Sequence, residues 1–258
     1  MVRFFISIAM VLSMFSIIPV PRFEWKKENM AFMLANLPFA GLPVFAAAVI
    51  WFYAAGALKI GPVAFAVVLT FLPLIISGGI HMDGYLDTHD ALASFAETAK
   101  KREILKDPHI GTFAAVWGIT YVALFFCAVM ETEWDIGKII IFGCMQLSAR
   151  AVGAFLSLNV YSYGSGYSGL FSSAADKRTS NIILLIYFMA SCGAAAVADP
   201  CAAVIMAAVS AFCALGVNRM ANKQFGGMSG DIAGYAIQLS ALLMMIIYAL
   251  FGKVVALL

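Results

Sequence analysis

Long apolar segments recur along this chain and leave little room for a soluble fold. Each approaches the roughly 20 residues that an α-helix needs to cross a bilayer. Only 12% of the residues are charged, against about 25% in an average soluble protein. We therefore expect an all-α, polytopic membrane helix bundle of about seven spans, folded as a single domain over residues 1–258. The segments cover roughly residues 31–57, 60–80, 110–130, 138–158, 181–198, 201–217 and 232–251.

The first twenty residues are also apolar, but they end at Pro19-Val20-Pro21, ahead of a charged stretch from Arg22 to Glu28. This segment is short for a span. We expect a short N-terminal re-entrant or interfacial helix here, in addition to the seven spans.

Lysine and arginine gather on one side of the expected bundle. Loops rich in these residues remain in the cytoplasm. We therefore expect a multi-pass protein of the cell (inner) membrane, with its long loops and any active site on the cytoplasmic side. Successive loops alternate between the two sides of the membrane, which places eleven basic residues on that side and Lys59, Lys138 and Lys253 on the opposite side. The eleven are Arg22, Lys26, Lys27, Lys100, Lys101, Arg102, Lys106, Lys177, Arg178, Arg219 and Lys223.

Three aspartates, Asp83, Asp87 and Asp90, directly follow the segment at 60–80. On a helix, with about 100° per residue, they fall within an arc of roughly 60°. Carboxylates so close repel one another, and near a bilayer none is cheap to bury. A divalent cation would relieve this repulsion, and oxygen ligands favour Mg²⁺, or Mn²⁺, over zinc. The alternative is a solvated helix face, but Gly78-Gly79 and Gly84 indicate close backbone approach instead.

A glycine-rich turn precedes the last apolar segment, with the sequence Gly226-Gly227-Met228-Ser229-Gly230-Asp231. Such a turn at the start of a helix presents free backbone N–H groups to a phosphate. Asp231 would then be a fourth metal ligand, or it would merely cap the helix that follows.

A basic stretch from Lys100 to Lys106 lies close to the aspartates in the sequence, and it suits a polyanionic substrate. Arg102 and Lys106 are its candidates for phosphate contacts, although such charge also marks contact with anionic lipid. Next to it, Asp107-Pro108 is typical of a helix start, as is Asp199-Pro200.

Two further features are candidates for ligand contact. Arg150 lies inside an apolar segment, where a charge is either functional or reaches the membrane edge. The loop from Tyr161 to Phe171, rich in glycine and serine, could close over a ligand. His81 points away from Asp83 on a helix, which favours a structural or hydrogen-bonding role.

Together these stretches resemble the cobalamin synthase family, also called adenosylcobinamide-GDP ribazoletransferase. The resemblance covers nearly the whole chain. It rests on Pro19-Val20-Pro21, Gly78-Gly79-x-His81-x-Asp83-Gly84-x-x-Asp87-Thr88-x-Asp90, Glu103-Ile104-Leu105-Lys106-Asp107 with Gly111-Thr112, Arg150, and Gly226-Gly227-x-Ser229-Gly230-Asp231 with Gly234.

The resemblance implies a membrane-bound, Mg²⁺-dependent phosphotransferase of late cobalamin (vitamin B12) biosynthesis. Its substrates would be adenosylcobinamide-GDP and α-ribazole or α-ribazole 5′-phosphate, and its products adenosylcobalamin or its phosphate, and GMP. We expect a lipid bilayer around it and no nucleic acid partner. Asp83, Asp87, Asp90 and Asp231 would hold metal, and an aspartate (Asp83 or Asp87) or His81 would accept a proton. The expected substrate contacts are Arg102, Lys106, Arg150, Gly78, Gly79, Gly226, Gly227, Ser229 and Gly230.

Two other classes compete with this hypothesis. An ion-coupled secondary transporter would use the acids as a cation site, but it favours acids near mid-membrane and a repeat between the halves. An enzyme acting on CDP-alcohols also clusters aspartates, but it expects an arginine after the first Asp-Gly. Here Asp83-Gly84-Tyr85-Leu86-Asp87 contains no arginine.

Overall fold

The computed structural model describes residues 2–21, 23–163 and 167–257. Apart from one isolated bridge between Ser162 and Met228, these residues form only helices and their connections, so the all-α expectation is confirmed. Most of the elements are α-helices. They are α1 (Val2–Phe15), α2 (Lys27–Met30), α3 (Met33–Asn36), α4 (Leu42–Ala57), α5 (Pro62–Ile76), α6 (Ile80–Ala93), α7 (Thr98–Ile104), α8 (Thr112–Met130), α9 (Ile136–Asn159), α10 (Tyr167–Ala174), α11 (Lys177–Ala198), α12 (Pro200–Met220) and α13 (Gly230–Ala256), with a 3₁₀-helix η1 (Leu37–Gly41) and a π-helix η2 (Ala221–Phe225).

Six helical stretches of the described chain are long and apolar enough to cross a membrane. A seventh is obtained if α5 and α6 are counted as one broken span, which agrees with the expected seven. The six are Lys27–Ala57, Thr112–Met130, Ile136–Asn159, Lys177–Ala198, Pro200–Phe225 and Gly230–Val255.

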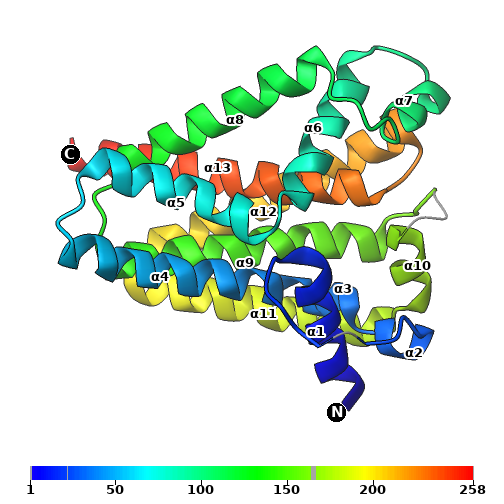
Figure 1. The fold of residues 1–258 in the computed structure, drawn as a ribbon, viewed down its shortest axis with the longest axis horizontal. Helices are drawn as coiled ribbons and strands as arrows, with labels where there is room; N and C mark the ends of the chain where they lie inside the picture. The colour runs from blue at the N-terminus through cyan, green and yellow to red at the C-terminus, as the bar shows by residue number, and fades with distance from the viewer. Residues whose placement is uncertain (1, 22, 164–166, 258) are drawn as a thin grey trace.

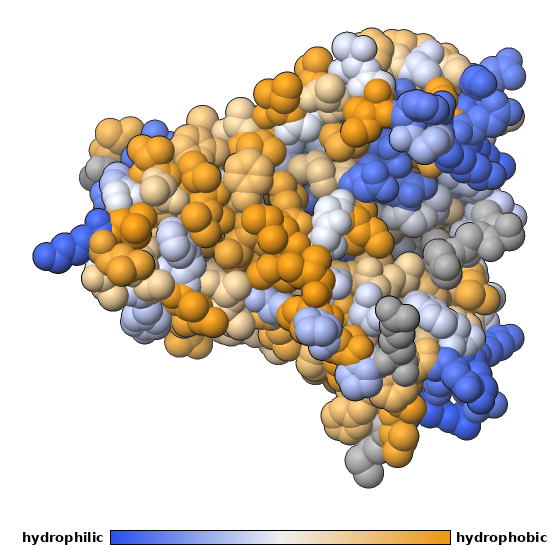
Figure 2. All heavy atoms as spheres, in the orientation of Figure 1, coloured by the Kyte–Doolittle hydropathy of each residue, from blue (hydrophilic) through white to orange (hydrophobic). Residues whose placement is uncertain are grey.

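Helix α9 forms the centre of the bundle, with α4, α11, α12 and α13 packed around it (Figure 1). The outer faces of α11 and α12 carry exposed large apolar side chains, and apolar atoms dominate the middle of the surface in Figure 2. A soluble protein rarely exposes an apolar surface of this extent, so these faces are suited to contact lipid. The exposed side chains include Ile182, Leu185, Ile186, Met189, Val204, Phe212 and Leu215.

Two helices run across the bundle rather than along it, as Figure 1 shows for α1 and α6. Helix α1 has 14 residues and is about 21 Å long, too short for a span, as the N-terminal sequence predicted. Helix α6 is bent by 89° from α5. The break follows Pro73 and uses Gly78 and Gly79, whose φ values of 63° and 77° suit glycine.

Polar atoms gather at the end of the bundle where α6, α7 and the start of α13 meet (Figures 1 and 2). The C-terminus lies at the opposite end. Residues 164–166, part of the loop expected to close over a ligand, lie outside the described residues; the chain after them forms α10.

Candidate active site

Helix α6 holds Asp83, Asp87 and Asp90 on one face, as their spacing predicted. Asp83 is exposed, whereas Asp87 and Asp90 are half-buried. The helix begins after Gly79, whose carbonyl accepts the N–H of Asp83 at 2.9 Å. The broken span therefore carries the three carboxylates on a helix that leaves the axis of the bundle.

Aromatic rings anchor the opposite face of α6. The ring of His89 is stacked on Trp117 of α8, with centroids 4.3 Å apart, and Tyr85 is stacked on Tyr235 of α13 at 5.5 Å. These contacts fix the rotation of α6 about its axis, and so they fix the direction of the carboxylate face.

Asp231 joins the cluster because α6 and α13 touch at Gly84. A β-carbon on Gly84 would lie 2.5 Å from the carbonyl oxygen of Asp231 and 2.7 Å from its Cα, so a larger residue has no room there. Ser229 caps α13, with its hydroxyl accepting the N–H of Ile232 at 3.3 Å. The alternative that Asp231 serves as the cap is therefore wrong. Its carboxylate instead accepts a hydrogen bond from the Ser229 hydroxyl at 3.3 Å.

Asp87 is half-buried and lies near the negative charges of Asp83, Asp231 and Asp90. Within the described chain, Asp83, Asp87 and Asp231 have no salt bridge to a lysine or arginine. Carboxylate oxygens are the donors that Mg²⁺ prefers, so metal binding by these acids stays a prediction. As they stand, no three His, Cys, Asp or Glu side chains among the described residues converge closely enough to hold a metal ion.

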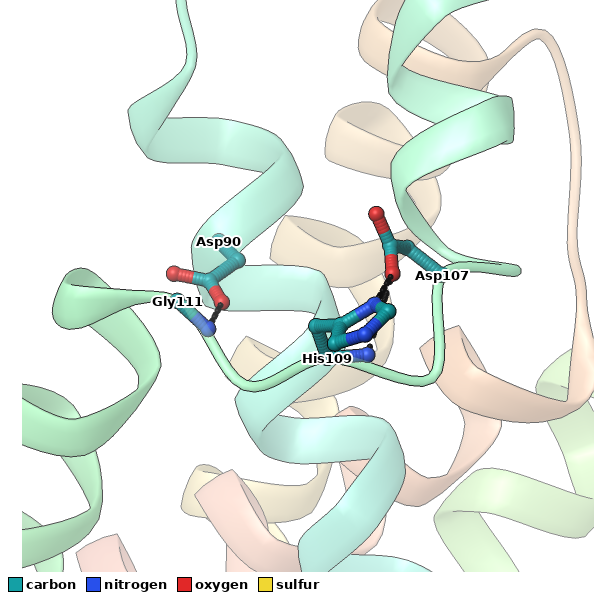
Figure 3. A network of polar contacts seen from close by, with 4 residues as sticks. All are labelled: Asp90, Asp107, His109 and Gly111. Atoms are coloured by element: carbon teal, nitrogen blue, oxygen red, sulfur yellow. Dashed lines mark hydrogen bonds and ion pairs between the residues drawn. The ribbon is translucent and has the colours of Figure 1, made fainter.

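Asp90 also caps helix α8, a role that the sequence did not reveal. One carboxylate oxygen accepts the N–H of Gly111 at 2.7 Å, and the other accepts that of Ala114 at the same distance. Figure 3 shows the first of these bonds. These bonds satisfy N–H groups that a helix N-terminus leaves free. If Asp90 also binds a metal, as predicted, the metal would have to be held by the carboxylate lone pairs that these two hydrogen bonds leave free.

The expectation that Asp107-Pro108 starts a helix is wrong, because α8 begins at Thr112. Asp107 instead accepts hydrogen bonds from the backbone N–H of His109 at 3.0 Å and from its ring Nδ1 at 2.7 Å (Figure 3). These bonds lower the pKa of the Asp107 carboxyl. At the other end of the bundle, Asp199-Pro200 does start a helix, with Asp199 as the cap of α12.

Arg102 ties three segments together at the edge of the site. Its Nε donates to the carbonyl of Phe225 at 2.7 Å, and its guanidinium lies 4.1 Å from the ring centroid of Tyr163. The neighbouring Lys101 donates to the side chain of Gln224. Helix α7 is thereby docked on η2 and on the turn that leads into α13.

A cavity of about 350 Å³ opens beside these groups. Its lining includes the predicted site residues Asp83, His81, Arg102, Lys106, Ser229, Gly230 and Asp231. It also includes Tyr163 and a set of apolar side chains that the sequence did not single out, among them Phe15, Leu37 and Phe171. Tyr163 and Phe171 belong to the loop from Tyr161 to Phe171 that was expected to close over a ligand. Nothing in the sequence pointed to Phe15 or Leu37.

The other predicted contacts do not line this cavity. Gly78 and Gly79 form the bend before α6, and Gly226 and Gly227 form the turn before α13, with φ values of 67° and 143°. Arg150 is 1% exposed, and its Nη1 donates to the backbone carbonyl of Gln146 at 2.9 Å. Substrate contact by these residues stays a prediction.

His81 is enclosed by its neighbours. Its ring is stacked on Phe15 with centroids 5.6 Å apart, and its Nε2 is buried without a hydrogen-bond partner. Because Nε2 is buried, whereas Asp83 is exposed and lines the cavity, the geometry favours an aspartate as the proton acceptor.

Comparison with known proteins places this arrangement in a family. A family model described as cobalamin-5-phosphate synthase matches residues 7–249. The chain belongs to the cobalamin-5-phosphate synthase family. The expected resemblance is thereby confirmed, and an enzyme of cobalamin synthesis takes precedence over the transporter and CDP-alcohol alternatives.

Curated relatives of this chain carry the name adenosylcobinamide-GDP ribazoletransferase. The protein of Lachnoclostridium phytofermentans is 34% identical, with 89% of this chain and 87% of the relative covered. A Clostridium perfringens protein is 28% identical, with 92% and 94% covered, and one from Geobacillus thermodenitrificans is 25% identical, with 89% of each covered. No solved structure matches the chain.

Proposed function

We propose that this member of the cobalamin-5-phosphate synthase family joins adenosylcobinamide-GDP to α-ribazole or α-ribazole 5′-phosphate, in a Mg²⁺-dependent reaction that yields adenosylcobalamin or its 5′-phosphate and GMP. The substrates follow from the names of its relatives. The observation that carries the proposal is that Asp83 and Asp231 lie with Arg102 and Lys106 at one cavity, and that Asp87 lies near both acids. Acids that hold a metal next to cations suit a pyrophosphate substrate.

In the reaction, a free ribose hydroxyl of the nucleoside forms a bond to the phosphorus next to the cobinamide arm. It is not the 5′-hydroxyl, because that oxygen carries the phosphate in α-ribazole 5′-phosphate. The bond from that phosphorus to the bridging oxygen breaks, and GMP leaves with the bridging oxygen. The hydroxyl proton passes to a carboxylate of the cluster. Asp83 is best placed to accept it, because it is exposed and lines the cavity.

Asp83, Asp87 and Asp231, with the remaining lone pairs of Asp90, would hold the metal. Bound Mg²⁺ would supply positive charge to the pyrophosphate oxygens and to the departing phosphate. Arg102 and Lys106 would contact the remaining phosphate oxygens from the other side of the cavity. Arg102 is suited to this because its bond to Phe225 orients the guanidinium in advance.

The site is proposed to face the cytoplasm from the cell membrane. Lysines and arginines gather at the end of the bundle that carries α6 and α7, as the count along the sequence predicted. Adenosylcobinamide-GDP carries a charged pyrophosphate, so access from an aqueous compartment suits it.

The direct test is GMP release by detergent-solubilised protein from adenosylcobinamide-GDP and α-ribazole, with Mg²⁺ and with a chelator in excess. We expect GMP to form only with the metal and in step with new cobalamin. The Lachnoclostridium phytofermentans relative, assayed in parallel, shows whether the conditions support the reaction. Activity of the relative but not of this protein would contradict the proposed function. Equal turnover with Mg²⁺ and with excess chelator would contradict the proposed Mg²⁺ dependence.

A further inference from the structure

The cavity beside the carboxylates has two chemically different walls. One carries the charged side chains and belongs to α6, α7 and the start of α13, with Ile80 and Leu105 among them. The other is apolar and comes from α1, α3, η1 and α10 together with α13. The apolar wall consists of Met14, Phe15, Leu34, Leu37, Phe171 and Ile237.

The apolar wall is fixed in place before any ligand arrives. Phe15 is stacked on His81 with an interplanar angle of 16°, and Phe171 on Trp25 with 20°. Just beyond Phe15, the N–H of Ile17 donates to the carbonyl of Ile76 at 2.9 Å, which ties the end of α1 to α5. Such a preformed wall lowers the cost of ordering a bound ring.

The apolar wall is a better environment for a flat apolar group than for a flat polar group. Ser157 lies beside it, but its hydroxyl already donates to the carbonyl of Gly153 at 2.9 Å. A guanine ring has several donors and acceptors on its edge, and against these side chains they would lose their hydrogen bonds to water without replacement. A benzimidazole with only carbon substituents has a single acceptor, its free ring nitrogen, and so loses fewer hydrogen bonds.

Size points the same way. A volume of about 350 Å³ is near the lower end of the roughly 300–1,000 Å³ typical of small-molecule sites. A nucleoside has about this scale. A corrin ring with its amide arms and its attached nucleotide is far too large for it.

We propose that this cavity binds the nucleoside substrate, with its benzimidazole ring against Phe15, Leu37 and Phe171 and its ribose directed toward Asp83, Arg102 and Lys106. The corrin of the other substrate then stays outside the cavity. This assignment rests on the proposed function for the identity of the nucleoside. It makes Phe15 and Phe171 determinants of specificity for the apolar base.

The first test measures binding without turnover. Calorimetry would compare α-ribazole with GMP on purified protein, and on the variants Phe15→Ala, Phe15→Leu and Phe5→Ala. Phe5 is the matched control, since it is on the same helix but 65% exposed and outside the cavity. We expect Phe15→Ala to weaken α-ribazole binding about tenfold, Phe15→Leu to weaken it less, and Phe5→Ala to leave it unchanged.

Competition provides a test that needs no variant. α-Ribazole bound to the wild-type protein should resist displacement by GMP, which carries a polar base. Equal competition by GMP would overturn the assignment, and so would unchanged α-ribazole binding by a folded Phe15→Ala protein.

Steady-state kinetics separates this inference from the proposed function. Phe15→Ala should raise the KM for α-ribazole about tenfold and leave the KM for adenosylcobinamide-GDP unchanged. A rise confined to the KM for the corrin substrate would overturn the cavity assignment while the function stands. Selective binding of α-ribazole by a protein that makes no cobalamin would support the cavity assignment and contradict the function.

Discussion

At the scale of single residues, the aspartates of α6 differ in what surrounds them. Asp83 is open to the cavity, Asp87 is crowded by its neighbours, and Asp90 is already bonded to the start of α8. A shared helix face therefore does not mean equal roles. Substitutions at Asp83 and Asp90 should separate chemistry from stability.

Replacing Asp83 by Asn should lower kcat at least about 100-fold, because a charged oxygen beside the transferred phosphate is lost. The fold should be retained, since Asp83 is exposed. Glu103→Gln is the control, as Glu103 is an exposed acid paired only with Lys100 on the surface. Turnover and thermal unfolding of both variants check this, and near-normal turnover of Asp83→Asn would remove that residue from the site.

Replacing Asp90 by Ala should destabilise the protein by about 1–2 kcal/mol, the usual cost of losing a helix cap. Asp135→Ala is the matched control, because Asp135 caps α9 at the other end of the bundle by accepting the N–H of Lys138 at 2.9 Å. Both variants should unfold at lower temperature in detergent. Only Asp90→Ala should also lose Mg²⁺-dependent turnover, and a loss of turnover in both would show that activity merely follows stability.

At the scale of elements, the contact between α6 and α13 assembles the site. Gly84→Ala would place a methyl group 2.5 Å from the carbonyl oxygen of Asp231, so the two helices would have to separate. We expect turnover to fall at least about tenfold and the unfolding temperature to fall with it. Gly216→Ala on α12, which meets open space, should leave both unchanged or raise stability slightly. Normal turnover of Gly84→Ala would show that close approach is not needed.

The docking of α7 on η2 makes a second prediction about elements. Arg102→Lys keeps the charge but loses the Nε hydrogen bond to Phe225 and the guanidinium over Tyr163. We expect kcat/KM for adenosylcobinamide-GDP to fall about tenfold. Arg219→Lys, at an exposed position outside the cavity, provides the comparison. If charge alone mattered, the two variants would behave alike.

Local patterns in the sequence predicted local structure well. The helical spacing of Asp83, Asp87 and Asp90 needs only residues within two turns, and so does the cap at Asp199-Pro200. The role that was missed depends on a distant partner, because Asp90 reaches 21 residues along the chain to Gly111. The close contact between Gly84 and Asp231 likewise joins residues far apart in the sequence. The apolar wall combines α1, α10 and α13, which no local pattern connects.

At the scale of the whole molecule, the helices that carry the candidate active site meet at one end of the bundle, and the C-terminus lies at the other end (Figure 1). The excess of lysine and arginine at the α7 end predicts that this end is cytoplasmic. The C-terminus should then lie outside the cytoplasm. A C-terminal alkaline phosphatase fusion should be active in intact cells, whereas a fluorescent protein at that position should stay dark. A control fusion truncated after Lys106 should give the reverse pattern, because that loop is expected to face the cytoplasm. Fluorescence from the C-terminal fusion would place the carboxylates on the other side of the membrane, away from phosphorylated substrates made inside the cell.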